Sequence, residues 1–419
     1  MGIRKIMRWL LAKILANTPL KNALRGFFIR FPRLDFWLRY RFLPFLTLSA
    51  SQRDNKPHAQ QIIPEPDPTH SFYFQHRDGH YFELVFHTAA LADQRGIGRV
   101  SKALFNEFEK RSIQAPHKAM SLPKVHFYPT IHWCPTVLPR PCCILIHDVI
   151  PLLYDSHFNA VAEHWRKDLQ PIAQQADQVL TISYASAGDI AEQLNLSPER
   201  IHVVYNGIQA LPQAKAEITL PSDHLNKPYV VFIGSSDYHK NLQVVIRALQ
   251  HLQDTSIQLC LIGHNEDVMN LAKRYEVQDQ LVLLGRLDDQ TAANVMSRAL
   301  ALVFPSLYEG FGLPPFEAAL LGTPSICSQR PAMDELLKDA CLFCPPDDPK
   351  AWASAIRRYW QDAELRQHYA SKAQKIAQQL TWEQSAQASL AVLATMAGQA
   401  SPISESKTPQ AEQTEAKAA

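Results

Sequence analysis

Short apolar runs alternate with amphipathic stretches through most of the chain. The runs at 81–86, 229–233 and 299–304 have the length of buried strands. The residues between such runs repeat their apolar positions every three or four residues, as helices do. Strands alternating with helices predict an α/β fold with parallel, doubly wound sheets. Further strands are expected at 125–128, 142–146, 179–182, 202–205, 258–262, 281–284, 325–327 and 341–343.

Two interruptions divide this alternation into domains. The stretch 51–70 is polar and contains four prolines, and 208–228 is irregular with three more, so we expect a linker and a hinge there. A chain of 419 residues also exceeds one ordinary core, which favours two domains. The expected parts are a basic helical extension (1–50), the linker (51–70), two α/β domains (71–210 and 228–360), C-terminal helices (361–397) and a disordered tail (398–419).

The seven cysteines do not resemble the disulfide framework of a small secreted protein. Buried, reduced thiols are the simpler interpretation, and they favour a cytosolic compartment. Cys341 and Cys344 form a lone CxxC pair without a second pair, so a structural role is favoured over a metal or redox role. We find no other cluster of metal-ligand residues.

The basic residues are concentrated at the beginning of the chain. Residues 1–50 contain ten Lys and Arg against one acid, Asp35, although the net charge of the whole chain is only +2. Ile6, Leu10 and Ile14 have helical spacing among these charges, which predicts a basic amphipathic helix on an anionic membrane surface. A helical hairpin packed on the protein itself is the alternative. No apolar run approaches the ~20 residues of a membrane span, and no secretory signal is expected.

The segment 306–318 carries the clearest chemical signal. It follows the apolar run 299–304, contains two glycines, and leads into a helix whose start is marked by Pro314-Pro315. Free N–H groups at such a helix start can bind an anion. Glu309 in the loop and Glu317 in the expected first turn of the helix would repel phosphate, so hydroxyl groups are their natural partners. The combination predicts a nucleotide-sugar site.

This segment resembles the signature of retaining glycosyltransferases of family 4. Glu309 and Glu317 are separated by seven residues, and the sequence between them begins Gly-Phe-Gly-Leu-Pro. The resemblance extends over roughly residues 80–395 and implies the GT-B fold, in which two Rossmann-like domains face each other across a cleft. The N-terminal domain would bind the acceptor and the C-terminal domain the nucleotide sugar. The C-terminal helices at 361–397 would cross back to the N-terminal domain. Three further segments occur in family order, at 232–242, 146–151 and 200–207.

The resemblance implies a role for each polar residue of the site. Lys240 would be the cation for the departing diphosphate, Glu309 would contact the transferred sugar, Glu317 would bind the ribose, and His147 would face the sugar or the acceptor. Glu309, Lys240 and His147 form the expected catalytic set. Each side chain also has a structural interpretation: Lys240 as a helix cap, Glu317 as a helix-dipole partner, and His147 as a buried structural histidine.

One phosphate-binding cation is missing from the family pattern. Some relatives have Arg where this chain has Ser235, and many have Arg where it has His239. A protonated His239 or Arg99, which follows Gly96-Ile-Gly98 in the expected loop after the first strand, could replace it. The expected donor-binding set is Gly96, Gly98, Arg99, Gly234, Ser235, His239, Lys240, Arg286, Leu287, Gly310, Phe311, Gly312, Leu313 and Glu317.

The resemblance points to bacterial mannosyltransferases of surface-polysaccharide assembly. It implies transfer of a hexose, with mannose from GDP-mannose as the best candidate, to a lipid-linked or oligosaccharide acceptor in polysaccharide or lipopolysaccharide synthesis. No metal, other cofactor or nucleic-acid partner is expected. We expect the protein to be cytoplasmic and peripheral on the inner face of the cytoplasmic membrane. Two alternatives remain: a nucleotide-sugar epimerase of the same architecture, and a non-catalytic partner subunit lacking the usual cations.

Overall fold

The computed structural model describes residues 68–76, 78–93, 96–116, 121–212, 227–252, 256–263 and 268–399. The basic extension, most of the linker and nearly all of the tail predicted from the sequence lie outside these residues. The chain divides into two compact units, one of residues 63–150 with 168–419 and one of residues 1–62 with 151–167. None of the helices in the described ranges has the length and apolar character needed to cross a membrane.

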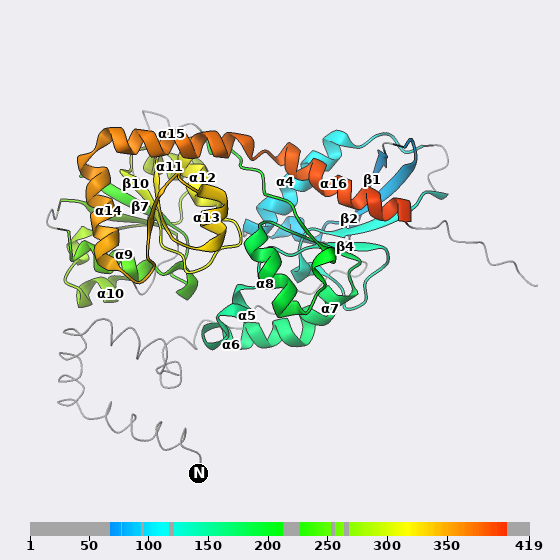
Figure 1. Cartoon of the computed structure of the whole chain (residues 1–419), viewed down its shortest axis with the longest axis horizontal. Helices are drawn as coiled ribbons and strands as arrows, with labels where there is room; N and C mark the ends of the chain where they lie inside the picture. The colour runs from blue at the N-terminus through cyan, green and yellow to red at the C-terminus, as the bar shows by residue number, and fades with distance from the viewer. Residues whose placement is uncertain are drawn as a thin grey trace, which may run out of the picture. The chain divides into compact units, whose positions relative to one another are not determined.

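The larger unit contains two six-stranded sheets in its described part (Figure 1). The first has the strand order β1-β2-β3-β4-β5-β6, and its strands are parallel except that the edge strand β1 is antiparallel to β2. We call the part built on it the N-terminal lobe. Its strands are β1 (Thr69–Gln75), β2 (Tyr81–His87), β3 (Lys124–Tyr128), β4 (Cys142–Leu145), β5 (Gln178–Thr181) and β6 (Ile201–Val203).

The second sheet is parallel in its described strands and has the order β12-β11-β10-β7-β8-β9. The order reverses between β7 and β10, the arrangement at which open α/β sheets bind ligands. We call this part the C-terminal lobe. Its strands are β7 (Tyr229–Ile233), β8 (Gln258–Ile262), β9 (Leu281–Gly285), β10 (Ala301–Phe304), β11 (Ser325–Ser328) and β12 (Leu342–Cys344). The α/β class predicted from the sequence is confirmed.

Helices connect these strands and form the C-terminal part of the chain. The longer ones are α4 (Gly96–Arg111), α7 (Gln170–Gln175), α8 (Tyr184–Leu194), α9 (Leu242–Leu249), α10 (Val268–Arg274), α11 (Asp289–Ser297), α12 (Leu313–Leu320), α13 (Pro331–Leu337), α14 (Pro349–Gln361), α15 (Ala363–Gln379) and α16 (Trp382–Gln399). Short 3-10 helices are Ala89–Ala92, Ile131–Trp133, Pro198–Arg200, Tyr238–Lys240 and Gln278–Gln280.

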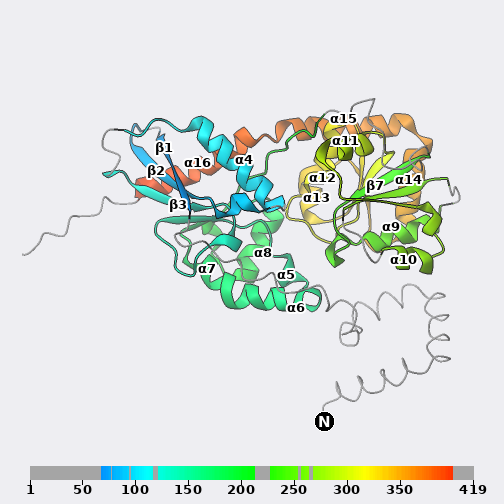
Figure 2. The same cartoon turned by 180° about the vertical axis from the view of Figure 1, so that it is seen from behind.

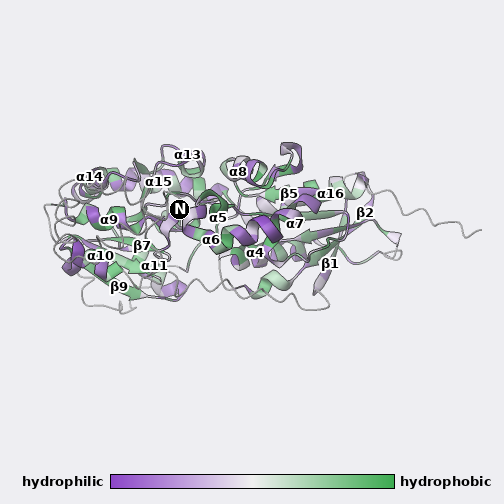
Figure 3. Ribbon diagram, turned by 90° about the horizontal axis from the view of Figure 1, so that it is seen from below, coloured by the Kyte–Doolittle hydropathy of each residue, from purple (hydrophilic) through white to green (hydrophobic). Residues whose placement is uncertain are grey.

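Both faces of the second sheet are covered because its strands are apolar on both sides. Val230 and Phe232 of β7 belong to the core beneath α9 and α14, whereas Val231 packs into a second core with α11 on the opposite face. Parallel strands buried in this way have continuous rather than alternating apolar runs. Figure 3 shows the contrast between hydrophobic β7 and the hydrophilic residues on α10 and α14.

Local sequence signals determine several helix starts. The Ser183 side chain accepts a hydrogen bond from the Ser186 N–H and caps α8, and the Asp288 side chain accepts one from the Thr291 N–H and caps α11. One strand was not predicted. β1 (Thr69–Gln75) begins inside the expected linker, and its pairing with β2 depends on Phe72 and Phe74, which are buried against the N-terminal sheet.

The C-terminal helices connect the two lobes of the larger unit, as the resemblance implied. α15 packs against α12 of the C-terminal lobe, and α16 packs against α4, β2 and β3 of the N-terminal lobe (Figure 2). Burial of Ala386, Leu393 and Met396 against the first sheet's core explains this position.

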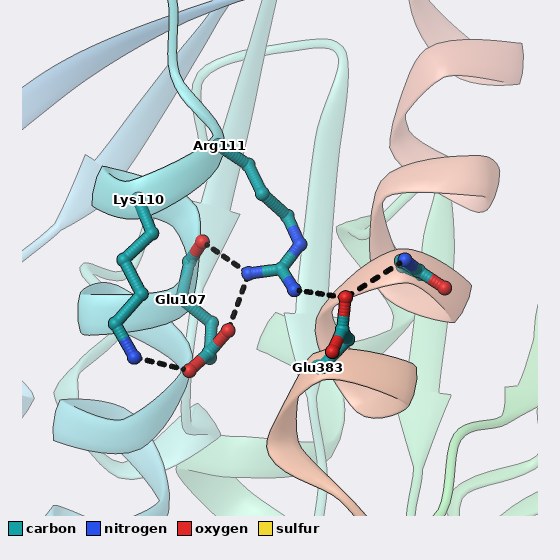
Figure 4. A pocket seen from close by; sticks show the side chains of 5 residues that line it. Glu107, Lys110, Arg111 and Glu383 are labelled. Carbon is teal, nitrogen blue, oxygen red and sulfur yellow. Dashed lines mark hydrogen bonds and ion pairs between the residues drawn. The ribbon is translucent and has the colours of Figure 1, made fainter.

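A charged network also links α16 to α4 (Figure 4). Arg111 pairs with Glu107 on its own helix and with Glu383 on α16 at 3.1 Å, and Lys110 contacts Glu107 at 2.8 Å. These side chains and Gln387 line a hollow of about 580 Å³. Because the charges already neutralise one another, the network is explained by its role in holding α16.

The described part of the smaller unit is a short helical segment. It contains most of α5 (Ile150–Leu153), the whole of α6 (Asp155–His164) and the beginning of a π-helix (Trp165–Leu169). Two ion pairs lie within it, between Arg166 and Asp155 at 2.7 Å and between Lys167 and Glu163 at 2.6 Å. Both pairs are exposed, so solvent screens them and neither contributes much to stability.

Candidate functional site

Two of the predicted donor-binding segments meet at the reversal point of the second sheet. β7 leads into the turn that contains Lys240, and neighbouring β10 leads into the loop that contains Glu309. Both connections leave the carboxyl ends of adjacent parallel strands, so they emerge side by side. The two segments are 69 residues apart in the chain, and the sheet order brings them together.

Lys240 and Glu309 form an ion pair. The Lys240 Nζ atom donates to Glu309 Oε1 at 2.7 Å, and the two side chains are 21% and 13% exposed. The Leu307 N–H donates to the carbonyl of His239 at 2.6 Å, which ties the two segments through their backbones. The Lys240 ammonium also lies 5.8 Å from the centre of the Phe304 ring. Lys240 is therefore held in place and is not a free cap of the following helix.

Asn241 is a supporting residue that the sequence interpretation missed. It has a left-handed backbone conformation, with φ of 51°, and ends the 3-10 turn containing Lys240. Its amide nitrogen donates to the carbonyls of Pro305 at 3.1 Å and Pro346 at 2.8 Å. Asn tolerates this conformation better than most residues, so a Lys-Asn pair before an apolar helix was the available signal.

Gly310 brings the Glu309 loop into close contact with the N-terminal lobe. A Cβ atom at this position would lie 2.8 Å from the carbonyl oxygen of His147 and 3.3 Å from the Cβ of Asp148. The Ser186 hydroxyl donates to the Gly310 carbonyl at 3.4 Å. Only glycine permits this approach without a backbone shift, so the loop glycine is explained by packing between lobes as well as by flexibility.

The helix after this loop begins as the prolines predicted. Gly312 is its N-cap in a left-handed conformation, with φ of 84°, and α12 runs from Leu313. Phe311 is buried between Tyr205 and Phe316, so its side chain serves packing and only its backbone is available to a ligand.

Glu317 is the fifth residue of α12, so its expected place in the first turn is wrong. The Arg99 guanidinium of the N-terminal lobe donates to Glu317 Oε1 at 2.8 Å. The carboxylate is only 6% exposed, whereas the Arg99 side chain is 50% exposed. Burial raises the pKa of Glu317 and Arg99 opposes this shift. The helix-dipole interpretation of Glu317 is therefore replaced by pairing with a cation from the other lobe.

Gly96 and Gly98 also differ from expectation. They lie in the first turn of α4 and not in a loop before it. A Cβ atom on Gly98 would lie 2.0 Å from the carbonyl oxygen of Asp93, so this glycine lets the helix start pack against the preceding segment. Because the helix already begins at Gly96, Arg99 projects from the first turn of this sixteen-residue helix and not from a loop.

His147 and Asp148 follow β4 at the carboxyl edge of the first sheet. Burial lowers the pKa of His147 to about 4, so the ring is neutral near pH 7. The ring hydrogen-bonds to the Pro129 carbonyl, and its buried Nε2 atom has no partner within the described residues. A neutral ring bonded in this way presents Nε2 as an acceptor for a hydroxyl group.

Asp148 lies beside His147 in the segment 146–151, but the sequence interpretation assigned it no role of its own. Burial and the charge of Glu309 raise its pKa to about 6, while the Ile150 N–H and Lys240 oppose the shift. Its carboxylate accepts a hydrogen bond from the Ile150 N–H at 3.1 Å. Its proximity to Glu309 and Lys240 was not visible in the sequence, because the contact joins the two lobes.

The other candidates for donor binding occupy different environments. Burial and neighbouring Lys240 lower the pKa of His239, which argues against a protonated His239 as the second cation. The Ser235 hydroxyl donates to Asp237 at 2.6 Å, and the Gly234 N–H donates to the Ile262 carbonyl at 2.9 Å. Arg286 is exposed directly after β9, next to the partly buried Leu287. Their roles toward a donor remain predictions.

A second carboxylate contact joins the lobes. Glu335 of α13 accepts hydrogen bonds from the backbone N–H groups of Tyr184 at 2.9 Å and Ala185 at 3.1 Å, at the start of α8. A carboxylate at a helix N-terminus is stabilised by the free N–H groups and the helix dipole. Nearby, the Tyr308 hydroxyl donates to Asp189 of the same helix. These contacts fix the Glu309 loop relative to α8.

The described part of the chain contains no group of His, Cys, Asp and Glu side chains arranged to hold a metal. Cys341 and Cys344 are buried free thiols, as are the other five cysteines. Burial raises the pKa of the Cys344 thiol to about 12, so this thiol is protonated and unreactive near neutral pH.

Comparison with known proteins matches both lobes to glycosyltransferases. The family model described as Glycosyltransferase Family 4 matches residues 75–210, and the model described as Glycosyl transferases group 1 matches residues 219–376. The chain is 32% identical over 228 residues to the O-antigen chain mannosyltransferase RfbU of Salmonella typhimurium. This match covers 54% of this chain and 62% of that protein. It is 29% identical over 232 residues to O-antigen chain mannosyltransferase B of Escherichia coli, covering 52% and 61%. The chain thus spans about three fifths of the length of these relatives.

Two solved structures have the same fold. Anabaena HepE in complex with UDP and glucose superposes with a TM-score of 0.53 at 20% identity, covering 65% of this chain and 77% of that one. Sucrose-phosphate synthase from Thermosynechococcus elongatus gives a TM-score of 0.53 at 19% identity, covering 80% and 88%. The shared architecture is the GT-B fold, which confirms the fold expected from the sequence.

Proposed function

Because the chain belongs to glycosyltransferase family 4, we propose that it transfers a hexose, with retention of anomeric configuration, from a nucleotide sugar to a glycan or lipid-linked glycan acceptor. The observation that carries this proposal is the pairing of two carboxylates with cations: Glu309 of the loop with Lys240, and Glu317 of α12 with Arg99. A nucleotide sugar offers two negative phosphates for the cations and two sets of hydroxyl groups for the acids.

The chemistry required is stabilisation of a departing diphosphate. Negative charge grows on that group as the bond to the sugar breaks, so cations and N–H donors already in place supply most of the catalysis. Lys240 is held at the carboxyl end of β7, and the N–H groups of Gly312 and Leu313 lie at the start of α12. Arg99 supplies the second cation that Ser235 and His239 do not provide. Two cations favour an enzyme over the alternative of a non-catalytic subunit.

Hydroxyl groups of the transferred sugar are the proposed partners of Glu309 and His147. Glu309 accepts hydrogen bonds, and the Nε2 atom of neutral His147 is a further acceptor on the opposite lobe. The leaving phosphate itself takes the proton of the acceptor hydroxyl in this proposal, so no enzyme base is required. Glu309 and Glu317 therefore do not act as the acid and nucleophile of a glycosidase.

Mannose from GDP-mannose is the proposed donor combination. The support is that two relatives at 32% and 29% identity are both named O-antigen chain mannosyltransferases. The proposed acceptor is correspondingly a growing surface polysaccharide or its lipid-linked precursor.

A donor screen tests the proposed function. We expect GDP-mannose to raise the thermal midpoint of unfolding and to be hydrolysed slowly without an acceptor, more than GDP-glucose, UDP-glucose, UDP-N-acetylglucosamine or ADP-glucose. Binding that stabilises only the folded state shifts the midpoint in proportion to ligand occupancy. A protein stabilised by none of these donors would contradict the proposal, and formation of an epimer of UDP-N-acetylglucosamine without acceptor would favour the epimerase.

We also propose that residues 1–50 attach the enzyme to an anionic membrane surface. The support is the sequence alone: ten basic residues against one acid, with Trp and Phe among them. Deleting residues 1–50 is expected to abolish co-sedimentation with vesicles of phosphatidylglycerol while transfer to a soluble acceptor continues. Neutral phosphatidylcholine vesicles are the control, and undiminished sedimentation of the deletion variant would refute the proposal.

A further inference from the structure

We propose that the donor displaces Arg99 from Glu317. In the donor-free protein the Arg99 guanidinium is hydrogen-bonded to the carboxylate that binds the ribose hydroxyls. When the donor binds, the guanidinium moves to the diphosphate. This inference rests on the proposed function, because it assumes that Glu317 binds the ribose. It adds that the ribose subsite is filled by the protein's own side chain until the donor arrives.

The first argument is the position of the pair. Glu317 projects from α12 of the C-terminal lobe, and its side chain is only 6% exposed. Arg99 projects from the first turn of α4 in the N-terminal lobe and donates to Glu317 Oε1 at 2.8 Å. A ribose that donates two hydroxyl hydrogen bonds to Glu317 competes with this guanidinium at Oε1.

The second argument is the unequal freedom of the two site cations. Half of the Arg99 side chain is exposed to solvent, whereas only 21% of Lys240 is exposed. Lys240 also lies beside the Phe304 ring and in a turn tied to the Glu309 loop by the bond between the Leu307 N–H and the His239 carbonyl. The Arg99 side chain has three rotatable methylene groups and a fixed helical base, so its guanidinium can swing while its backbone stays in place.

The third argument is charge balance. Burial disfavours the ionised form of Glu317, and Arg99 offsets this cost in the donor-free protein. Ribose hydroxyls are neutral and cannot replace that positive charge. The diphosphate brings its own negative charge next to the ribose, so the guanidinium is expected to move to a phosphate, where a bidentate contact is available, and to remain near Glu317.

This exchange predicts opposite effects of one substitution on two ligands. In Arg99→Gln, a nucleoside no longer has to displace the guanidinium, so its affinity should rise about threefold, as expected for the loss of a half-exposed ion pair. A nucleoside diphosphate loses its phosphate contact in the same variant, so its affinity should fall about tenfold or more.

The experiment measures both affinities on the full chain by ligand-observed NMR or calorimetric competition. Guanosine and GDP are the probes, replaced by uridine and UDP if the donor screen selects a uridine donor. Lys102→Gln is the matched control, since Lys102 is exposed on the same helix three residues further on. It removes the same charge without touching Glu317, and both affinities should stay unchanged. Arg99→Lys should fall between wild type and Arg99→Gln.

A second measurement needs no variant. Salt screens the exposed side of the Arg99–Glu317 pair, so the wild-type affinity for the nucleoside should rise with sodium chloride while that for the diphosphate falls. Two results together would show that Arg99 stays on Glu317: lower affinity for both ligands in Arg99→Gln, and a wild-type affinity for the nucleoside that falls with salt. They would overturn the proposed exchange but not the proposed function. A wild-type protein that binds no nucleoside diphosphate would instead overturn the proposed function.

Discussion

Replacing Glu309 with glutamine is expected to lower kcat by about 10²–10³-fold while nucleoside diphosphate binding is retained or becomes severalfold tighter. Glu309 is the proposed contact for the transferred sugar, so turnover depends on it. The same carboxylate neutralises Lys240 at 2.7 Å in the donor-free protein. Without it, Lys240 is free to attract the diphosphate, which explains why binding should not suffer.

The measurement is a comparison of initial rates with the dissociation constant of the nucleoside diphosphate. Glu192→Gln is a suitable control, since Glu192 is exposed on α8 and outside the site. Glu317→Ala should show the opposite profile, with donor binding weakened more than turnover at saturation. Equal losses of nucleotide affinity in both variants would refute the division of labour between the two acids.

The architecture was largely predictable because it depends on local patterns. Continuous apolar runs such as 229–233 are required by strands buried on both faces, and these runs stand out in a single sequence. Capping residues such as Ser183 act within one turn, so their effect is also local. β1 was missed because its alternating phenylalanines directly follow a proline-rich stretch. They form a buried strand only through pairing with β2, which the sequence of this segment does not show.

The sequence singled out the residues of the candidate site but not the contacts between them. The loop around Glu309 and Glu317 was identified from residue types and spacing. Its pairing with Arg99 joins residues 218 positions apart on different lobes, and no periodicity encodes such a contact. The resemblance left Arg99 and His239 equally open as the second cation. In the structure Arg99 contacts Glu317, whereas burial lowers the pKa of His239.

Asp148 shows why long-range electrostatics also escape the sequence. The residue type suggests an ordinary carboxylate that caps the short helix after β4, and it does accept a hydrogen bond from Ile150. The shift of its pKa to about 6 arises from burial and from Glu309, which reaches it only because Gly310 packs against the His147 carbonyl. Neither cause can be read from the segment that contains Asp148.

Replacing Lys240 with methionine is expected to lower kcat/KM for the donor by about a thousandfold, the largest effect of any charge removal outside the two acids. Methionine keeps the apolar contact with the Phe304 ring but removes the cation nearest the carboxyl end of β7. Both the ground state and the departing diphosphate lose this charge, so KM should rise and kcat should fall together. The variant also leaves Glu309 largely buried without a cation, which adds repulsion toward the phosphates.

Lys240→Arg is the matched control because it retains the charge with a different shape. It should recover much of the binding but less of the turnover. The double variant Lys240→Met with Glu309→Gln provides a sharper measurement. Because Lys240→Met leaves Glu309 without its cation, adding Glu309→Gln should restore part of the nucleoside diphosphate affinity lost in Lys240→Met, by a factor that differs from the effect of Glu309→Gln alone. Strict additivity would mean that the ion pair does not persist in the donor-free protein, and that Lys240 and Glu309 act on the donor independently.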